Sequence, residues 1–238
     1  MLGRFLEIAV PAPDILESLA FYESLGYTQA TPGESRTHRY AVVTDGRLWL
    51  GLHAASVEEP TLCWVQPGLS AQVSALAALG IEPEHARLGE DDFHEVAYRD
   101  PAGQAVVLVE ARTYSPPAGG PPPPALPGYF EEYGVPARNV TRAAAWWDAL
   151  GCIAFDPVID PFPRVVVSHR DLNVGLYEWD LRRPVLVFSS TDAADRIASL
   201  RERGHRLHPT LPRGLDPASN AILVAPEGTW LLLTPGFE

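Results

Sequence analysis

Apolar and polar positions along this chain follow strand and helix periods in a fixed order. Residues 15–25 place apolar side chains at helical spacing directly after Asp14, a residue type that caps helix N-termini. Asp45-Gly46 separates two apolar runs and is a strong signal for a two-residue hairpin. The pattern therefore predicts one strand, one helix and three further strands, at residues 5–10, 15–25, 27–31, 39–44 and 47–53.

This order of elements occurs four times, in modules of about 55 residues. Leu25-Gly26 and Leu150-Gly151 both end helical stretches with a glycine suited to a C-cap, and other landmarks recur with the same separation of 124 or 125 residues. These landmarks are Gly51 and Gly175, Gly80 and Gly204, and Pro101-Ala102-Gly103 and Pro226-Glu227-Gly228. We therefore expect an α+β fold in which four βαβββ modules form two tandem domains. In each domain the helices should cover one face of a mixed sheet and leave the other face concave.

A segment rich in proline and glycine, residues 113–128, separates the two repeats. Proline cannot donate a backbone hydrogen bond and favours an extended conformation, so this segment is predicted to be a semi-rigid linker. The first domain then spans residues 1–112 and the second spans residues 129–238. The alternative is that the segment is a ligand for a proline-recognition domain, but a linker fits the repeat better.

The composition limits the classes of partner. The 238 residues are 46% hydrophobic, without an apolar run of about 18 residues and without a signal peptide, so we expect a cytoplasmic protein. All 18 basic residues are arginine, which excludes Schiff-base chemistry on lysine. The net charge of -12 opposes binding to nucleic acid or anionic membranes and is compatible with a cationic partner. Cys63 and Cys152 occupy non-equivalent positions and are expected to be reduced thiols.

Two motifs carry a resemblance to a known superfamily. They are the run from Glu7 to Tyr22 (EIAVPAPDILESLAFY) followed by Leu25-Gly26, and the run from Tyr98 to Gly103 (YRDPAG). They resemble the vicinal oxygen chelate superfamily, which includes glyoxalase I, extradiol dioxygenases, fosfomycin-resistance enzymes and bleomycin-resistance proteins. The resemblance covers nearly the whole chain as two glyoxalase-like domains. It is specific for the fold, whereas the superfamily hosts both metalloenzymes and metal-free drug binders.

The resemblance also locates the positions that ligate metal in the metalloenzymes of this group. They are Glu7, Gly51, Thr61 and Val107 in the first half, and Glu132, Gly175, Val185 and Leu232 in the second. Glycine, valine and leucine have no donor atom, so we expect no bound metal and no other cofactor. One alternative is that His53, two residues beyond Gly51 on the same strand face, forms a site with Glu7. No HxH or HExxH spacing is present.

Strand alternation predicts which side chains line the two concave faces. The predicted ligand-binding residues are Trp49, Gly51 and His53 in the first half, and Asn173, Gly175, Tyr177, Trp179 and Trp230 in the second. Glycine inside a strand is unfavourable, and its recurrence indicates room for a ligand or for close backbone approach. Aromatic rings above a glutamate suit an amphipathic cation. The alternative is that these rings fill the interior themselves.

Glu7 and Glu132 occupy equivalent positions on otherwise apolar strands. A buried carboxyl has a raised pKa and suits a general acid or base, although each glutamate would also serve as a tether to an arginine or to a neighbouring strand. The leading prediction is a metal-independent protein that binds a small metabolite or antibiotic, including self-resistance by sequestration. The alternative is a metal-free isomerase, cyclase or lyase of natural-product biosynthesis that uses Glu7 or Glu132. The partner is then a cationic or aromatic small molecule, and the protein is a monomer or homodimer.

Overall fold

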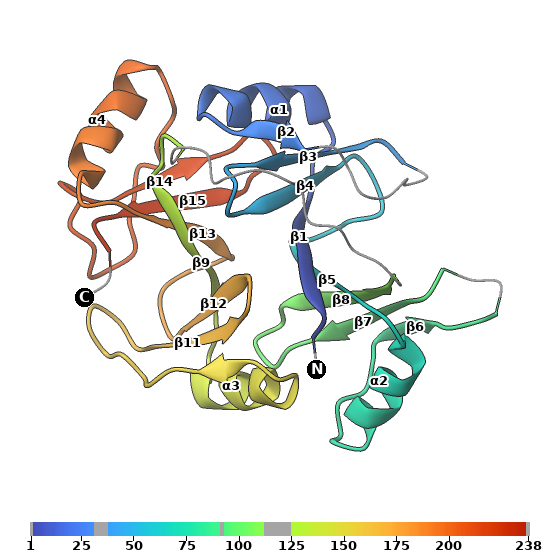
Figure 1. Cartoon of the computed structure of the whole chain (residues 1–238). Helices are drawn as coiled ribbons and strands as arrows, with labels where there is room; N and C mark the ends of the chain where they lie inside the picture. Colours follow the sequence, from blue (N-terminus) through green and yellow to red (C-terminus); the bar gives the residue numbers. More distant parts are fainter. Residues whose placement is uncertain (1, 31–37, 91–92, 112–124, 237–238) are drawn as a thin grey trace.

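A computed structural model describes residues 2–30, 38–90, 93–111 and 125–236. Two open mixed sheets of eight and seven strands lie side by side, with helices at both ends (Figure 1). The first half comprises β1 (Arg4–Pro11), α1 (Ile15–Ser24), β2 (Thr28–Ala30), β3 (Tyr40–Thr44), β4 (Trp49–His53), β5 (Thr61–Gln66), α2 (Leu69–Ala77), β6 (His85–Arg87), β7 (Glu95–Arg99) and β8 (Ala105–Glu110). The second half comprises β9 (Tyr129–Pro136), α3 (Val140–Ala149), β10 (Ile153–Ala154), β11 (Arg164–His169), β12 (Leu172–Tyr177), β13 (Val185–Ser189), α4 (Ala193–Glu202), β14 (Ala221–Val224) and β15 (Trp230–Thr234).

The strand orders confirm the α+β class and show how the modules join. They are β2-β3-β4-β1-β5-β8-β7-β6 and β10-β11-β12-β9-β13-β15-β14. In each sheet two modules meet through their antiparallel first strands, β1 with β5 and β9 with β13. The prediction of three strands after every helix is wrong for the fourth module. There the described chain forms only β14 and β15, with an isolated bridge between Leu207 and Leu223.

The local signals of the sequence are present at the element ends. Asp14 Oδ1 accepts a hydrogen bond from the Glu17 N–H at 3.1 Å, which caps α1. Gly26 follows the same helix with φ of +94°, a left-handed conformation that glycine adopts without steric cost. Asp45 Oδ1 accepts from the N–H groups of Arg47 and Leu48, which fixes the turn between β3 and β4. This turn spans residues 45–48 because Thr44 pairs with Trp49, so the expectation of a two-residue hairpin is wrong.

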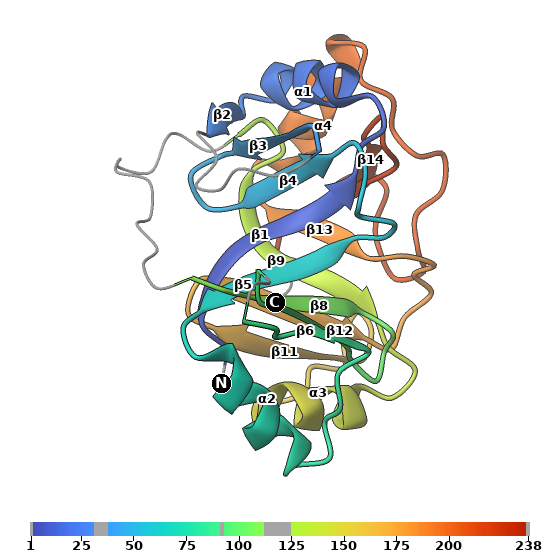
Figure 2. The same ribbon diagram turned by 90° about the vertical axis from the view of Figure 1, so that its right-hand side faces the viewer.

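The convex faces of the two sheets and the four helices enclose a shared core. Figures 1 and 2 show α1 beside α4 at one end and α2 beside α3 at the other, with strands between them. One continuous cluster of buried apolar side chains contains residues of both halves, among them Leu50, Trp64, Tyr133 and Trp147. The concave faces therefore point away from the junction of the halves, and each can hold a site of its own.

Hydrogen bonds between the halves repeat the internal symmetry. The Leu2 N–H donates to the Leu150 carbonyl at 2.9 Å, and the Leu126 N–H donates to the Leu25 carbonyl at 2.7 Å. Leu126 belongs to the predicted linker, whose residues 113–124 lie outside the described part of the chain. The domain boundaries therefore stay a prediction, although residues 125–128 pack onto the ends of the helices rather than projecting from them. Within the described ranges no helix is long and apolar enough to cross a membrane.

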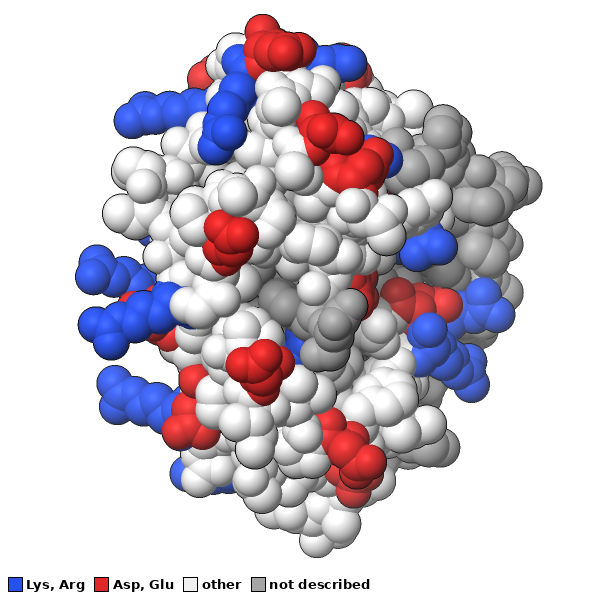
Figure 3. Space-filling view, turned by 90° about the vertical axis from the view of Figure 1, so that its left-hand side faces the viewer, with Lys and Arg blue, Asp and Glu red and all other residues white. Residues whose placement is uncertain are grey.

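The arginines of this acidic chain lie largely at its periphery. Figure 3 shows the outer face of the second half, where arginine side chains project at both edges and carboxylates are scattered over the face. Charges of both signs are interspersed, so this view shows no extended basic surface of the kind that binds nucleic acid.

Candidate functional site

Glu7, Gly51 and His53 meet on the concave face of the first half, as strand alternation predicts. Glu7 and His53 are 3% and 1% exposed, and His53 Nε2 lies 3.0 Å from Glu7 Oε1. Gly51 lies opposite Ala9 on the neighbouring parallel strand β1. A Cβ at residue 51 would overlap the Glu7 carboxylate and lie 2.8 Å from His53 Nε2. Glycine is therefore required here because the carboxylate and the imidazole fill the space above the strand.

A second imidazole extends this pair into a chain of three groups. His38 Nε2 lies 2.9 Å from His53 Nδ1, and the Tyr40 ring stacks on the His53 ring at 5.4 Å with an interplanar angle of 17°. Tyr40 is the cross-strand partner of His53, whereas His38 comes from the segment just before β3. His38 and Tyr40 are both partly exposed. The chain thus runs from a buried carboxylate to the accessible part of the concave face.

The order of donors in this chain follows from the chemistry of its groups. An ionised Glu7 only accepts hydrogen bonds, so His53 donates through Nε2–H. In the neutral ring His53 Nδ1 then accepts the hydrogen bond that His38 donates through Nε2–H. Through this chain of hydrogen bonds the Glu7 carboxylate orients both imidazole rings. This is the arrangement of a base whose tautomer is fixed by a carboxylate.

The equivalent place in the second half is built differently. Glu132 accepts a short hydrogen bond from the Tyr177 hydroxyl, and Arg164 Nη1 lies 3.6 Å from Glu132 Oε1. Tyr177 and Arg164 are cross-strand partners, at the places that His53 and Tyr40 take in the first half. Above Gly175 the space is filled by the Tyr177 ring and the Glu132 carboxylate. Here the glutamate tethers two neighbouring strands, and an arginine balances its charge.

Burial raises the pKa of Glu132, although the hydrogen bond from Tyr177 and the charge of Arg164 act in the opposite direction. The pKa of Tyr177 is raised well above its usual value, first by burial and then by the Glu132 charge. Tyr177 therefore remains a donor to Glu132 throughout the physiological range of pH.

The raised pKa of Glu132 predicts a pH-dependent stability. The folded state binds the Glu132 proton more tightly than the unfolded state, so the free energy of unfolding should fall as pH rises from about 4.5 through the folded-state pKa. Glu132→Gln cannot titrate and should lack this component. Urea denaturation of both proteins between pH 4 and 8 measures it. A stability difference between them that stays constant over this range would contradict the prediction.

The described residues on the concave faces do not fit a metal ion. The strand register places Cys63 opposite Glu7 and Val187 opposite Glu132, whereas Thr61 and Val185 lie opposite Ala9 and Gly134. Thr61 and Val185 therefore lie two residues along their strands from the residues that pair with the glutamates. Each sheet has a β-bulge beside its glutamate, between Phe5 and Glu7 and between Val187 and Phe188. The partners of the residues beyond a bulge cannot be found by counting along the two strands from a known pair.

The chemistry of the donors supports the same conclusion. In the first half, His53 directs its two ring nitrogens toward two different groups, so Glu7, His53 and His38 do not converge on one point. In the second half, the Arg164 guanidinium takes the place where a cation would balance Glu132. Among the described residues no group of three or more His, Cys, Asp or Glu side chains is arranged to hold a metal ion.

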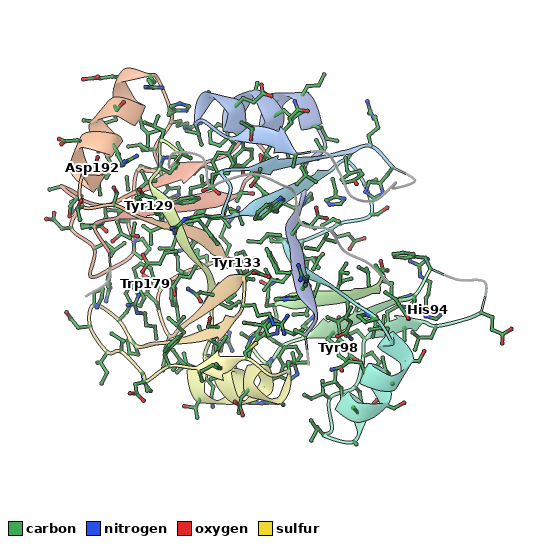
Figure 4. All side chains as sticks on the ribbon, viewed as in Figure 1. His94, Tyr98, Tyr129, Tyr133, Trp179 and Asp192 are labelled. Atoms are coloured by element: carbon green, nitrogen blue, oxygen red, sulfur yellow. The ribbon has the colours of Figure 1, made fainter. Side chains whose placement is uncertain are left out.

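The other predicted ligand-binding residues lie in three separate places. Trp49 and Asn173 line a groove of about 600 Å³ between the halves. Trp179 stacks on Phe162 at 3.7 Å and lines a pocket of about 870 Å³ that the second half forms together with Pro101 and Ala102 of the first half (Figure 4). Trp230 lies 4.8 Å from the His208 ring in a neighbouring depression. The structure thus brings Gly51 and His53 to Glu7, and Gly175 and Tyr177 to Glu132.

Sequence reasoning missed His38, Tyr40 and Arg164. A signal for Arg164 existed, because the two-residue turn at Arg170-Asp171 fixes Arg164 opposite Tyr177. No such signal existed for Tyr40, because the two-residue turn expected at Asp45-Gly46 would have placed His38 opposite His53. His38 precedes β3, where strand periodicity gives no direction for a side chain.

Comparisons with known proteins identify the fold. No protein-family model and no curated protein matches the sequence. Among solved structures, the chain is similar to a catechol 2,3-dioxygenase (14% identity, TM-score 0.57, covering 97% of this chain and 86% of that one). It is similar to 2,2',3-trihydroxybiphenyl 1,2-dioxygenase from Sphingomonas wittichii strain RW1 (15%, 0.58, 98% and 89%). It is also similar to an extradiol ring-cleaving dioxygenase from B. fuscum (14%, 0.61, 97% and 71%). These neighbours are extradiol dioxygenases of the vicinal oxygen chelate superfamily, and at such identity the likeness establishes the fold alone.

Proposed function

We propose that this chain is a metal-independent enzyme that binds a small organic molecule on the concave face of its first half and moves a proton on it. The observation that carries the proposal is the hydrogen-bonded chain from Glu7 through His53 to His38. A buried carboxylate that orients an imidazole is a recurring device for general acid and base catalysis. Of these three hydrogen-bonded groups, His38 is the one that would contact the substrate, and His53 and Glu7 position it.

The reaction class follows from what one base can do without a redox partner. A base that removes a proton from carbon and a conjugate acid that returns it at another atom together isomerise the substrate. If a leaving group departs instead, the product is that of a lyase. The stacked Tyr40 ring beside His53 offers an aromatic surface for a planar substrate. The proposal therefore favours small, conjugated carbonyl compounds with an acidified C–H bond.

The test is proton exchange by metal-depleted protein. The protein is dialysed against a chelator, its metal content is measured, and it is incubated in deuterium oxide with cyclic 1,3-diketones and aryl ketones while NMR follows their C–H signals. A base in the site should speed the loss of a C–H signal or convert the compound, even when metal is well below one equivalent per chain. Activity that disappears on metal removal and returns with about one equivalent of zinc, iron, manganese or nickel would contradict the proposal.

A second candidate function is sequestration of a ligand, which the sequence analysis favoured without choosing between the halves; we place it in the second half. The stacked pair Phe162 and Trp179 in the pocket of about 870 Å³ favours it. A binder should quench tryptophan fluorescence on ligand entry and convert nothing. Trp179→Ala should then weaken binding by roughly 1–3 kcal/mol.

A further inference from the structure

A separate cavity of about 280 Å³ lies between the two halves, on the opposite side of β1 from Glu7. Its inner wall consists of the buried side chains Ile8 and Val10 of β1, Tyr133 of β9 and Leu186 of β13. Tyr133 lies near the middle of the molecule, between the two sheets (Figure 4). The cavity therefore lies where the central strands of the two sheets meet between the pairs of helices.

The wall of this cavity offers little hydrogen bonding. The Tyr133 hydroxyl donates to Gln104 Oε1 at 3.1 Å, so this ring presents its apolar surface. The rim includes Pro11, Pro60 and Pro184, which have no backbone N–H to donate. An occupant of the interior is therefore an apolar group, because a polar group placed there would lose its hydrogen bonds to water.

The mouth of the cavity carries positive charge. Arg182 and Arg183 line it, and both are exposed. Arg183 donates to the Gly228 carbonyl at 3.1 Å and lies 5.2 Å from the centre of the Trp230 ring. Arg182 has no hydrogen bond or ion pair with any residue in the described part of the chain, so its guanidinium can turn to an anion at the mouth.

The single carboxylate among the lining residues is held by two hydroxyl groups of α1. Glu227 Oε1 accepts from the Tyr22 hydroxyl at 2.7 Å, and Glu227 Oε2 accepts from Ser18 Oγ at 2.8 Å. These bonds hold the Glu227 carboxylate toward α1. The cavity thus combines an apolar interior with a guanidinium at its entrance.

We infer that this cavity binds a small amphipathic carboxylate, with a single ring or a short alkyl chain inside and the carboxylate on Arg182. Arginine suits this role because its planar guanidinium donates two parallel hydrogen bonds to a carboxylate. The inference does not depend on the proposed function, because Ile8 and Val10 face away from Glu7 on the same strand.

The test uses 4-fluorobenzoate as the probe. Titration of the full-length protein is followed by fluorine NMR of the probe and by methyl NMR of Ile8, Val10 and Leu186. We expect saturable binding with shifts of these methyl signals. Arg182→Gln should weaken binding by about tenfold or more, because the carboxylate loses its hydrogen bonds to a charged donor. The matched control is Arg201→Gln, an exposed arginine on α4 that should leave binding unchanged.

Three results would overturn the inference. The first is the absence of saturable shifts at the Ile8 and Val10 methyl groups, which would mean that the cavity does not admit the probe. The second is an equal loss of affinity in Arg182→Gln and Arg201→Gln, which would indicate general electrostatic attraction. The third is equally tight binding of the uncharged analogue 4-fluorobenzamide. Proton exchange at the first-half site is measured separately, so failure of one test leaves the other intact.

Discussion

His53→Gln should lower the rate of substrate proton exchange by roughly 10²–10⁴-fold, the usual contribution of a positioned acid or base. Glutamine keeps a polar side chain of similar reach, but it cannot pass the influence of Glu7 on to His38. The measurement is the exchange rate of the substrate C–H signal between pH 5 and 9.

Two further variants separate this effect from simple damage to the protein. Gly51→Ala keeps all three hydrogen-bonded groups, but its Cβ would overlap the Glu7 carboxylate and crowd His53 Nε2. Exchange should therefore also slow. Glu132→Gln alters the buried carboxylate of the second half, at the position equivalent to Glu7, and should leave exchange unaltered. If Glu132→Gln abolishes exchange while His53→Gln retains it, the working site lies in the second half. If every variant keeps the wild-type rate, the chain of groups has no catalytic role.

Trp147→Ala should lower the free energy of unfolding by about 3–5 kcal/mol, as for other large core truncations. The Trp147 side chain is fully buried and packs against Trp64 at 5.9 Å. Its indole N–H donates to Asp100 Oδ2 at 3.0 Å, in the turn before β8. The substitution therefore removes a large apolar group from the shared core and a donor from a buried carboxylate. Chemical denaturation measures the loss.

Two further variants separate the contribution of the hydrogen bond to Asp100 from that of the buried ring. Trp147→Phe keeps most of the ring and removes only the donor to Asp100, so it should cost about 1–3 kcal/mol. Trp146→Ala alters the preceding, partly buried residue of α3 and should cost less than Trp147→Ala. If Trp146→Ala and Trp147→Ala were equally destabilising, the contact between the halves would not be a main source of stability.

The hydrogen bond of Trp147 to the other half has an equivalent at Tyr22. Its hydroxyl donates from α1 to Glu227 in the turn before β15, just as Trp147 donates from α3 to Asp100 in the turn before β8. Each half therefore anchors a helix to the turn of the other half. Burial raises the pKa of Asp100, which the hydrogen bonds from Gln104, Trp147 and Ala102 partly offset. Such contacts cannot be inferred from periodicity, because they join residues about 50 and 200 positions apart across two sheets.

The sequence by itself determined the elements and the concave residues that follow from strand alternation. Asp14, Asp45 and Gly26 act within a few residues along the chain, and the constant separation of the repeats carries each prediction to the second half. Glu7, Gly51 and His53 were placed on one face because side chains two apart on a strand point the same way. The missing strand of the fourth module falls in residues 203–220, where Pro209, Pro212 and Pro217 remove backbone donors.

Only the tertiary structure decided which groups surround each glutamate and where the cavities lie. The pairing of the central strands places Cys63 and Val187 opposite Glu7 and Glu132. His38 reaches His53 from outside β3, and the cavity bounded by Arg182 exists only where the two sheets meet. These contacts depend on strand pairing, on loops and on the packing of one sheet against the other. The spacing of polar and apolar residues along the sequence does not encode any of them.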